Sequence, residues 1–261
     1  MPWTLPWNID HDTQTLYLDV YGATDTPTFS SLANNAFSNL VTECINQRSF
    51  PRLDRHSEPF AIPGTPYPVQ IERFATSLFG TTTQGAHMTA YTHTTSGLKI
   101  WVPRRSAHLH TYPGRLDTTV AGGVSAHETP FENIVREAEE EASLPSDLVR
   151  EHARSVGCLT YMGMADDGRV LPDIIYCYDL ELAPEIVPKP DDDEVEAFYL
   201  MGVEEVKASM LRQEFKTNCA VVMIDFFIRH GIVTASNEPD YVEIVMRMHR
   251  RLPFRTTPPR S

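Results

Sequence analysis

A short acidic segment, Arg136-Glu137-Ala138-Glu139-Glu140-Glu141, concentrates the side chains best suited to chemistry. On a helix, Glu137, Glu140 and Glu141 would project from one face, because residues three and four positions apart are neighbours on a helical surface. Like charges at this spacing destabilise a helix by about 0.2–0.5 kcal/mol per pair. A hard divalent cation would offset the repulsion, since Mg²⁺ prefers carboxylates, waters and phosphate oxygens as ligands. The segment therefore predicts a magnesium site on a helix.

The residues before the glutamates fit a site for phosphates. Gly122 and Gly123 allow a tight loop whose backbone can approach a phosphate closely. Pro130 suits the first turn of the helix that carries the glutamates. Arg136 is placed to pair with Glu128 and so to tie the loop to the helix. A glutamate-rich stretch is more often a solvated helix face, so the glutamates alone do not decide between a site and a surface.

A site for phosphates also needs cations, because the formal net charge of −13 would repel a polyanion. Metal ions would supply part of the positive charge. Four basic residues are candidates for contacts with substrate phosphates: Arg104, Arg105, Arg115 and Lys216. Each alone is a modest candidate, since surface arginines are common, but as a cluster they would make the site positive.

Hydrolysis requires a group that takes a proton from the attacking water. The candidates for this base are Glu194 and Glu196, and Glu137, Glu140 and Arg136 are further candidate catalytic residues. Glu194 lies at the start of a predicted strand, directly after the acidic run Asp191-Asp192-Asp193. The aspartates are expected to be a solvated charge run, whereas a catalytic and a bland role for Glu194 remain equally open.

The elements that must position these residues follow from hydrophobic periodicity and turn signals. For residues 1–80 the pattern predicts a small α+β module, with helices over Thr28–Gln47 and Val69–Phe79. Residues 81–252 predict an α/β domain, and residues 253–261 a frayed tail. Within the α/β domain we expect a loop at Ala121–Gly123, strands over 87–93, 98–103, 156–164, 174–182 and 195–201, and helices over 130–143, 219–230 and 240–251.

Composition narrows the class of protein further. The chain has 261 residues, of which 41% are hydrophobic and 22% charged, as in ordinary globular proteins. Its acidic balance argues against non-specific binding to nucleic acid or to an anionic membrane. No apolar run approaches the roughly 20 residues needed to span a bilayer, and the N-terminus does not read as a secretory signal. The four cysteines form no zinc pattern, so we expect reduced thiols and a cytoplasmic location.

The spacing of the whole segment from Gly122 to Leu144 resembles the Nudix box. It reads as glycine, five residues, Glu128, seven residues, Arg136-Glu137, an apolar residue, any residue, Glu140-Glu141, any residue, a small residue and an apolar residue. The one departure is Ser143, where the general pattern has glycine. The resemblance implies a Nudix α/β/α sandwich and a Mg²⁺ (or Mn²⁺) cofactor. It also implies that Glu137 and Glu141 bind the metal, with Glu140 as a third ligand or a water-orienting group.

Segments outside the box resemble one Nudix branch, the thiamine-diphosphate-related proteins that carry an extra N-terminal domain and are sometimes fused to a thiamine pyrophosphokinase. Serine at position 143 is usual in that branch. The resemblance implies hydrolysis of damaged thiamine diphosphates, the oxo and oxy forms, to monophosphates, and a poorer activity on thiamine diphosphate itself. The branch also leads us to expect a lysine in the stretch 107–110, where this chain has none. The resemblance is carried by segments that include Trp101–Ser106, Thr111–Asp117, Phe198–Leu200, Glu214–Cys219 and Asp225–Gly231.

Two other functions remain open. A Nudix diphosphatase acting on a nucleoside diphosphate derivative, such as ADP-ribose, would use the same glutamates. A binding protein that kept the fold and lost catalysis is a second alternative, although the intact charges of the box argue against it. The expected partner is a small diphosphate, and a homodimer is left open.

Overall fold

The computed structural model describes residues 6–20, 25–51, 53–165 and 167–258. The first five residues, where no secretory signal is expected, and the last three residues of the expected tail lie outside this range.

The N-terminal part is built around one long helix. Helix α1 (Thr26–Asn46) begins where the Asp25 carboxylate accepts a hydrogen bond from the Thr28 amide at 2.8 Å, a side-chain cap of the free N–H groups. Its apolar face, with Ala36, Leu40 and Val41, packs into a core of its own with Trp7 and Ile71. The other elements are β1 (Trp7–Asp10), β2 (Thr15–Leu18), β3 (Pro59–Ala61), β4 (Gln70–Glu72), the 3-10 turn η1 (Arg73–Ala75) and α2 (Thr76–Phe79).

The helix expected over Val69–Phe79 is wrong in its first half. Residues Gln70–Glu72 form β4, which pairs antiparallel with β3, and only the four residues of α2 are α-helical before Gly80 ends them in a left-handed conformation. The apolar residues of this segment recur at helical spacing. Its backbone N–H and C=O groups nevertheless form hydrogen bonds with β3 instead of bonds within a helix.

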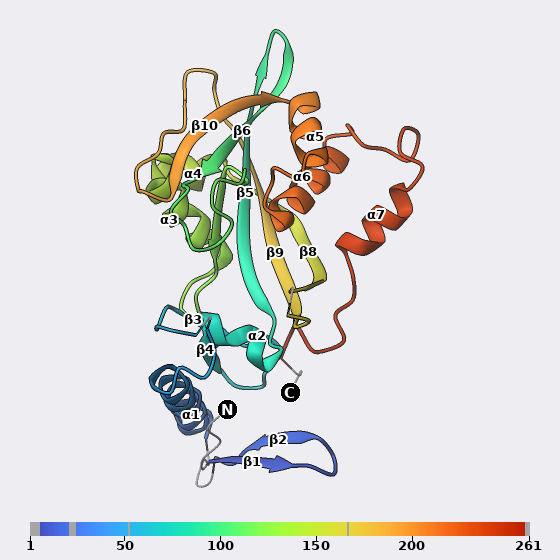
Figure 1. The fold of residues 1–261 in the computed structure, drawn as a ribbon. Helices are drawn as coiled ribbons and strands as arrows, with labels where there is room; N and C mark the ends of the chain where they lie inside the picture. The colour runs from blue at the N-terminus through green and yellow to red at the C-terminus, as the bar shows by residue number, and fades with distance from the viewer. Residues whose placement is uncertain (1–5, 21–24, 52, 166, 259–261) are drawn as a thin grey trace.

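A mixed six-stranded sheet forms the centre of the second part (Figure 1). The strand order is β10-β6-β5-β9-β8, with β7 paired to the first half of β5. Strands β5 and β9 run parallel, and the other neighbours are antiparallel. The strands are β5 (Thr83–Thr94), β6 (Gly97–Arg105), β7 (Val120–Gly123), β8 (Arg154–Met164), β9 (Val170–Glu181) and β10 (Val195–Gly202).

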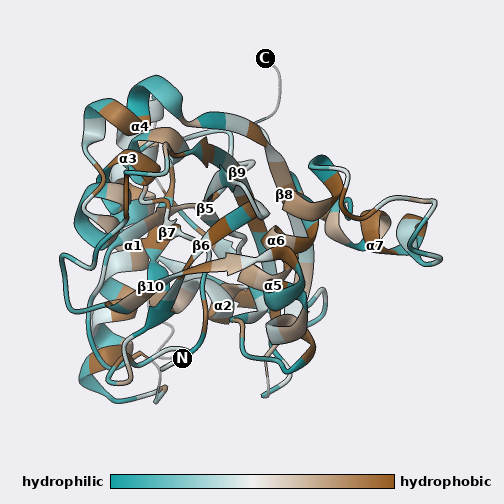
Figure 2. Cartoon of the chain, turned by 90° about the horizontal axis from the view of Figure 1, so that it is seen from above, coloured by the Kyte–Doolittle hydropathy of each residue, from teal (hydrophilic) through white to brown (hydrophobic). Residues whose placement is uncertain are grey.

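Helices cover both faces of this sheet. Figures 1 and 2 show α3 (Pro130–Ala142) and α4 (Ser146–His152) on one side, and α5 (Val203–Leu211) and α6 (Thr217–Arg229) on the other. Each side has its own buried cluster, one around Ile134 and Ala138 of α3 and one around Met223 and Phe226 of α6. Helix α7 (Tyr241–Met248) lies next to β8 and projects away from the body. The expected α/β/α sandwich is therefore confirmed.

The loop expected at Ala121–Gly123 is a strand. Residues Val120–Gly123 pair with Gly85–Met88 of β5, because the other half of β5 is taken by β6. The two glycines allow close backbone approach and are compatible with an extended chain, so their loop signal was misleading.

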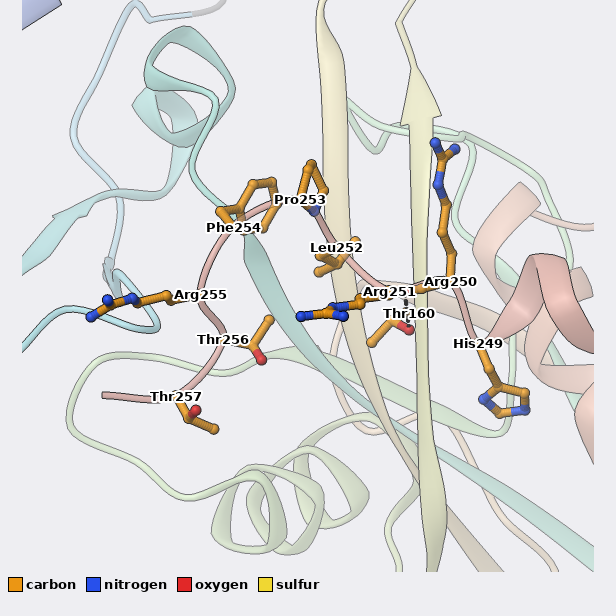
Figure 3. Close-up of a pocket in the computed structure, with 10 residues that line it drawn as sticks. All are labelled: Thr160, His249, Arg250, Arg251, Leu252, Pro253, Phe254, Arg255, Thr256 and Thr257. Carbon is orange, nitrogen blue, oxygen red and sulfur yellow. Dashed lines mark hydrogen bonds between the residues drawn. The ribbon is translucent and has the colours of Figure 1, made fainter. Parts of the chain in front are cut away.

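The chain after α7 returns along β8 towards the N-terminal part. The Arg250 amide donates to the Thr160 carbonyl at 2.9 Å, and the Thr160 hydroxyl donates to the Arg250 carbonyl at 2.8 Å. Further on, Arg255 approaches Gly64 so closely that a Cβ on Gly64 would lie 2.7 Å from Arg255 Cβ. Figure 3 shows the concave region of about 780 Å³ that this segment lines together with Thr160.

Candidate active site

Helix α3 is fixed at both ends. The Thr129 hydroxyl accepts from the Glu132 amide at 3.2 Å, and Pro130 occupies the first turn. Ser143 ends the helix with φ 52°, the left-handed conformation that usually falls to glycine. The buried residues Ile134, Ala138 and Ala142 hold the helix against the sheet. The glutamates are thereby presented from a rigid element rather than from a loop.

Glu137 and Glu141 face inward towards β7. The side chain of Glu137 is 16% exposed, and Glu141 as a residue is only 8% exposed. The Ala121 amide donates to the Glu141 carboxylate at 3.2 Å. Burial raises the pKa of Glu137 to about 7, and Arg136 only partly opposes it. Burial, with the charges of Glu137 and Asp117 added, raises the pKa of Glu141 well above its ordinary value. Of these two glutamates, only Glu137 has an ion-pair partner among the described residues, Arg136, so the two buried carboxylates are not both balanced by a protein cation.

Gly122 makes room for Glu137. A Cβ on Gly122 would lie 2.6 Å from Glu137 Cγ, and one on Gly123 would lie 2.5 Å from the ring of Phe60. A side chain at either position would displace its neighbour. Gly122 therefore leaves the space that the Glu137 carboxylate occupies, and Gly123 leaves the space that the Phe60 ring occupies.

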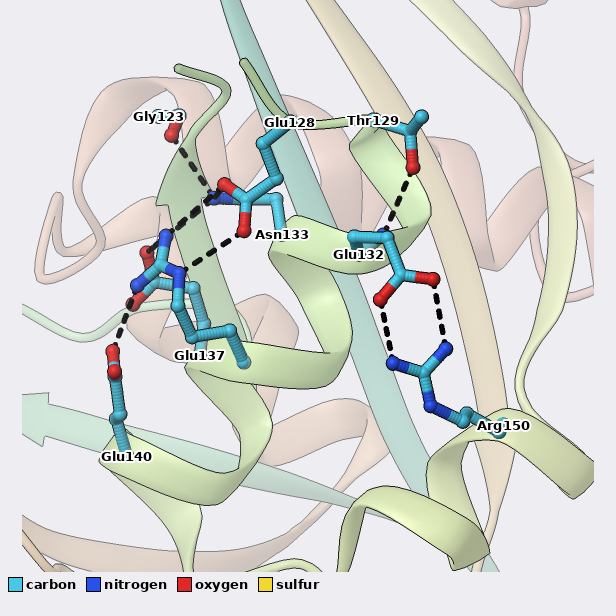
Figure 4. Close-up of polar contacts among 9 residues, drawn as sticks. Gly123, Glu128, Thr129, Glu132, Asn133, Glu137, Glu140 and Arg150 are labelled. Carbon is cyan, nitrogen blue, oxygen red and sulfur yellow. Dashed lines mark hydrogen bonds and ion pairs between the residues drawn. The ribbon is translucent and has the colours of Figure 1, made fainter.

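Arg136 ties the acidic groups together. Its guanidinium contacts Glu128 at 3.1 Å, Glu137 at 2.9 Å and Glu140 at 2.7 Å. Figure 4 shows the Glu128, Glu137 and Glu140 side chains turned toward the same region, and the Asn133 amide, beside Glu128, donates to the Gly123 carbonyl at 3.0 Å. The expected pairing of Arg136 with Glu128 is therefore present.

Asp117, which the sequence did not single out, is a second centre of charge. Its buried carboxylate contacts Arg105 at 3.1 Å and Lys216 at 3.7 Å, and accepts from the Thr118 amide at 2.8 Å. Burial alone would raise the pKa of Asp117, but Lys216, His87 and Arg105 together lower it to about 2. The pKa of Lys216 is in turn raised by Asp117 against the effect of its burial, and the lysine charge also acts on Glu141. Asp117 thus holds two cations beside the glutamates.

The other predicted site residues are less centrally placed. Arg104 donates to the Gly114 carbonyl at 2.8 Å, with its guanidinium 5.6 Å from the centre of the Tyr199 ring. Arg115 donates to the Gln213 carbonyl. Their contacts with phosphate stay a prediction.

The glutamates Glu140 and Glu194 differ in their surroundings, while Glu196, the other candidate for the base, is exposed within β10. Glu140 is about half exposed and engaged by Arg136. Glu194 is exposed at the start of β10, and its charge raises the pKa of both Glu137 and Glu141. Glu194 is therefore electrostatically coupled to the two buried glutamates at the site.

His87, Asp117 and Cys219 form a buried group whose ligand atoms lie within 4.8 Å of one another and could hold a metal ion. Cys219 Sγ lies 2.6 Å from the Asp117 carboxylate. Because Asp117 already contacts two cations, its charge is compensated without a further ion. Glu137 and Glu141 offer oxygen ligands, and within the described part of the chain Glu141 makes no ion pair, so these two residues fit Mg²⁺ or Mn²⁺ better.

The comparisons with known proteins agree with this geometry. The NUDIX domain model matches residues 87–219, and the chain belongs to this family. An uncharacterised protein of Saccharomyces cerevisiae is 39% identical over 203 residues, covering 73% of this chain and 59% of its own length. Nudix hydrolase 20 of Arabidopsis thaliana, a chloroplastic protein, is 38% identical over 183 residues, covering 69% of this chain and 48% of its own length.

The chain thus spans only about half of the length of these curated relatives. Among solved structures, a MutT protein from Methanosarcina mazei is similar with 16% identity and a TM-score of 0.43, covering 60% of this chain and 96% of its own. None of the described helices is both long and apolar enough to cross a membrane.

Proposed function

We propose that this chain hydrolyses a diphosphate bond with Mg²⁺ or Mn²⁺ and acts on damaged thiamine diphosphates, the oxo and oxy forms, with thiamine diphosphate a poorer substrate. The observation that carries the hydrolase proposal is the pair of buried glutamates, Glu137 and Glu141, whose raised pKa values mark a missing positive charge. The thiamine assignment rests on segments that resemble one Nudix branch. Those segments supply Arg105, Asp117 and Lys216.

The proposed mechanism divides the work among these residues. Glu137, Glu141 and, at the edge, Glu140 would hold the cation, which when bound neutralises the diphosphate and lowers the pKa of the attacking water. Arg136 keeps the Glu137 carboxylate in place. Arg105 and Lys216, held by Asp117, offer positive charge to the diphosphate, so that the substrate is positioned as well as neutralised.

We assign the general base to Glu194, because it is exposed and its charge acts on both metal-binding glutamates, whereas Glu140 is occupied by Arg136. Glu194 would take a proton from the attacking water while the water oxygen forms its bond to phosphorus. The bridging P–O bond breaks, and a monophosphate and inorganic phosphate leave. A cytoplasmic location is part of the proposal and is supported by the four free cysteines.

A substrate panel with Mg²⁺ tests the proposal: thiamine diphosphate, its oxo and oxy forms, and ADP-ribose. Wild type should release monophosphate from the damaged forms fastest, and Glu141→Gln should be nearly silent. Glu139→Gln, which changes an exposed glutamate of the same helix, is the matched control and should keep full activity. Preference for ADP-ribose would overturn the substrate assignment alone. A wild type no more active than Glu141→Gln on every compound would favour a non-catalytic binding protein.

A further inference from the structure

A row of polar side chains crosses three strands of the sheet and is not used by the proposed mechanism. Thr83 of β5 and Tyr161 of β8 lie directly opposite Asp173 of β9 in the register of the two strand pairs. Both hydroxyls donate to the Asp173 carboxylate, each at 2.9 Å, one to each oxygen. The carboxylate is therefore held in one orientation with acceptor capacity left on both oxygens.

This row lies on the α6 side of the sheet. Side chains alternate along a strand, so Asp173 shares a face with Ile175 and Cys177, which pack against Val222 of α6. Lys216 stands at the start of α6, and its charge acts on Asp173 as well as on Glu141. Lys216 thus connects the row electrostatically to the glutamate helix.

Asp173 is partly buried, and no ion pair with a described residue balances its charge. Among the residues that the structure describes, no Lys, Arg or His lies within ion-pair distance of its carboxylate. Burial raises the pKa of Asp173, and its hydrogen bonds and Lys216 offset the effect only in part. A ligand with a positive charge or an N–H donor would supply what is missing.

Two tyrosines add aromatic surface to the same region. The Tyr112 ring centre lies 6.0 Å from Lys216 Nζ, and burial and Asp173, with a smaller contribution from the nearby Tyr112, raise the pKa of Tyr161. Tyr112 is exposed although it is large and aromatic, and its φ of 51° is a costly backbone conformation for a non-glycine residue. Tyr112 therefore presents an exposed ring from a strained backbone position.

We propose that Asp173, Tyr161 and Tyr112 form a recognition subsite for a cationic or amino-bearing heteroaromatic ring, the organic group of the diphosphate substrate. The proposal rests on the diphosphatase function above and adds the feature that selects among diphosphates. The ring would donate to the Asp173 carboxylate and lie against the tyrosines, while Lys216 and Arg105 meet the phosphates. Such contacts favour aromatic cations because the ring face carries negative electrostatic potential.

Inhibition by fragments of the substrate separates the two halves of the site. Thiamine carries a ring and no phosphate, and inorganic diphosphate carries phosphates and no ring. With the best substrate of the panel, Asp173→Asn should raise the inhibition constant of thiamine at least about tenfold and leave that of inorganic diphosphate within about twofold. Lys216→Ala should do the reverse. Asp147→Asn, an exposed aspartate of α4, is the control.

Tyr161→Phe gives a second measurement that does not depend on the folding of Asp173→Asn. It removes the hydroxyl that orients Asp173 and keeps the ring, and it should weaken thiamine inhibition by a smaller factor. Unchanged thiamine inhibition in both variants would overturn the subsite while leaving the hydrolase intact. Adenosine and uridine serve as further probes. Asp173-dependent inhibition by adenosine and not by thiamine would support the subsite and contradict the thiamine assignment.

Discussion

The Glu137 side chain occupies the space that a side chain on Gly122 would need, since a Cβ there would lie 2.6 Å from Glu137 Cγ. Gly122→Ala should therefore displace the carboxylate without unfolding the domain. We expect a loss of about 10²-fold in kcat/KM, because small misplacements of catalytic groups have effects of that size. Gly163→Ala is the control, since an added Cβ there meets only Leu171 at ordinary contact distances. Equal activity of the two variants would argue against this role of Gly122.

Arg136 should not be replaceable by lysine. Its guanidinium reaches three carboxylates at once, which a single ammonium group cannot do. Arg136→Lys should lower kcat roughly 10- to 100-fold, as for other residues that orient metal ligands. Arg150→Lys is a matched control, because Arg150 makes a two-pronged pair with the exposed Glu132 of the same helix (Figure 4). Steady-state kinetics should show the loss in kcat for Arg136→Lys and an unchanged kcat for Arg150→Lys.

Metal should stabilise the wild type. At a Mg²⁺ concentration 100 times its dissociation constant, the free energy of unfolding should rise by about 2.7 kcal/mol. Glu141→Gln should lose most of this gain, yet its metal-free form should melt above metal-free wild type because a buried charge has been removed. Thermal denaturation with Mg²⁺ and with a chelator measures both effects. A metal-free Glu141→Gln protein that melts below wild type would contradict the electrostatic account of this residue.

His87 should make the protein acid-sensitive. Burial, helped by Lys216, lowers the pKa of His87 to about 3, whereas in the unfolded chain it titrates near 6.5. Between these values the unfolded state binds one proton more than the folded state, so stability falls as the pH falls. From pH 8 to pH 5 this histidine should remove about 2 kcal/mol from the free energy of unfolding. Urea titrations of wild type and His87→Gln should show a pH dependence that is shallower in the variant by that amount.

The sequence predicted the glutamate helix well and its surroundings poorly, for physical reasons. The order of Gly122, Glu128, Arg136 and Glu137 along one local segment fixes their mutual positions once the helix forms. Asp117 and Lys216 come together only because β6 and α6 meet in the folded sheet, and no local spacing announces that contact. The sequence does place an acidic residue, Asp117, shortly before the two glycines. That pattern is a weak indication of a site, because Arg105 and Lys216, which contact Asp117, are distant from it in the sequence.

Secondary structure shows the same division. The long periodic helices, such as α1 and α6, begin and end close to their predicted limits. The short α4 and α5 were missed, because seven to nine residues give too few turns for a clear period. Strand β7 was taken for a loop since its glycines favour turns, and only pairing with β5 makes it a strand.

The approach of Arg255 to Gly64 joins two segments that lie far apart in the sequence, since a Cβ on Gly64 would lie 2.7 Å from Arg255 Cβ. The hydrogen bonds between Thr160 and Arg250 lead the chain back along β8 to this contact. Contacts between residues so distant in sequence slow folding, because the entropy of closing the intervening loop must be lost before the contact stabilises anything. A variant that loosens this contact should therefore change the rate of unfolding more than the rate of folding.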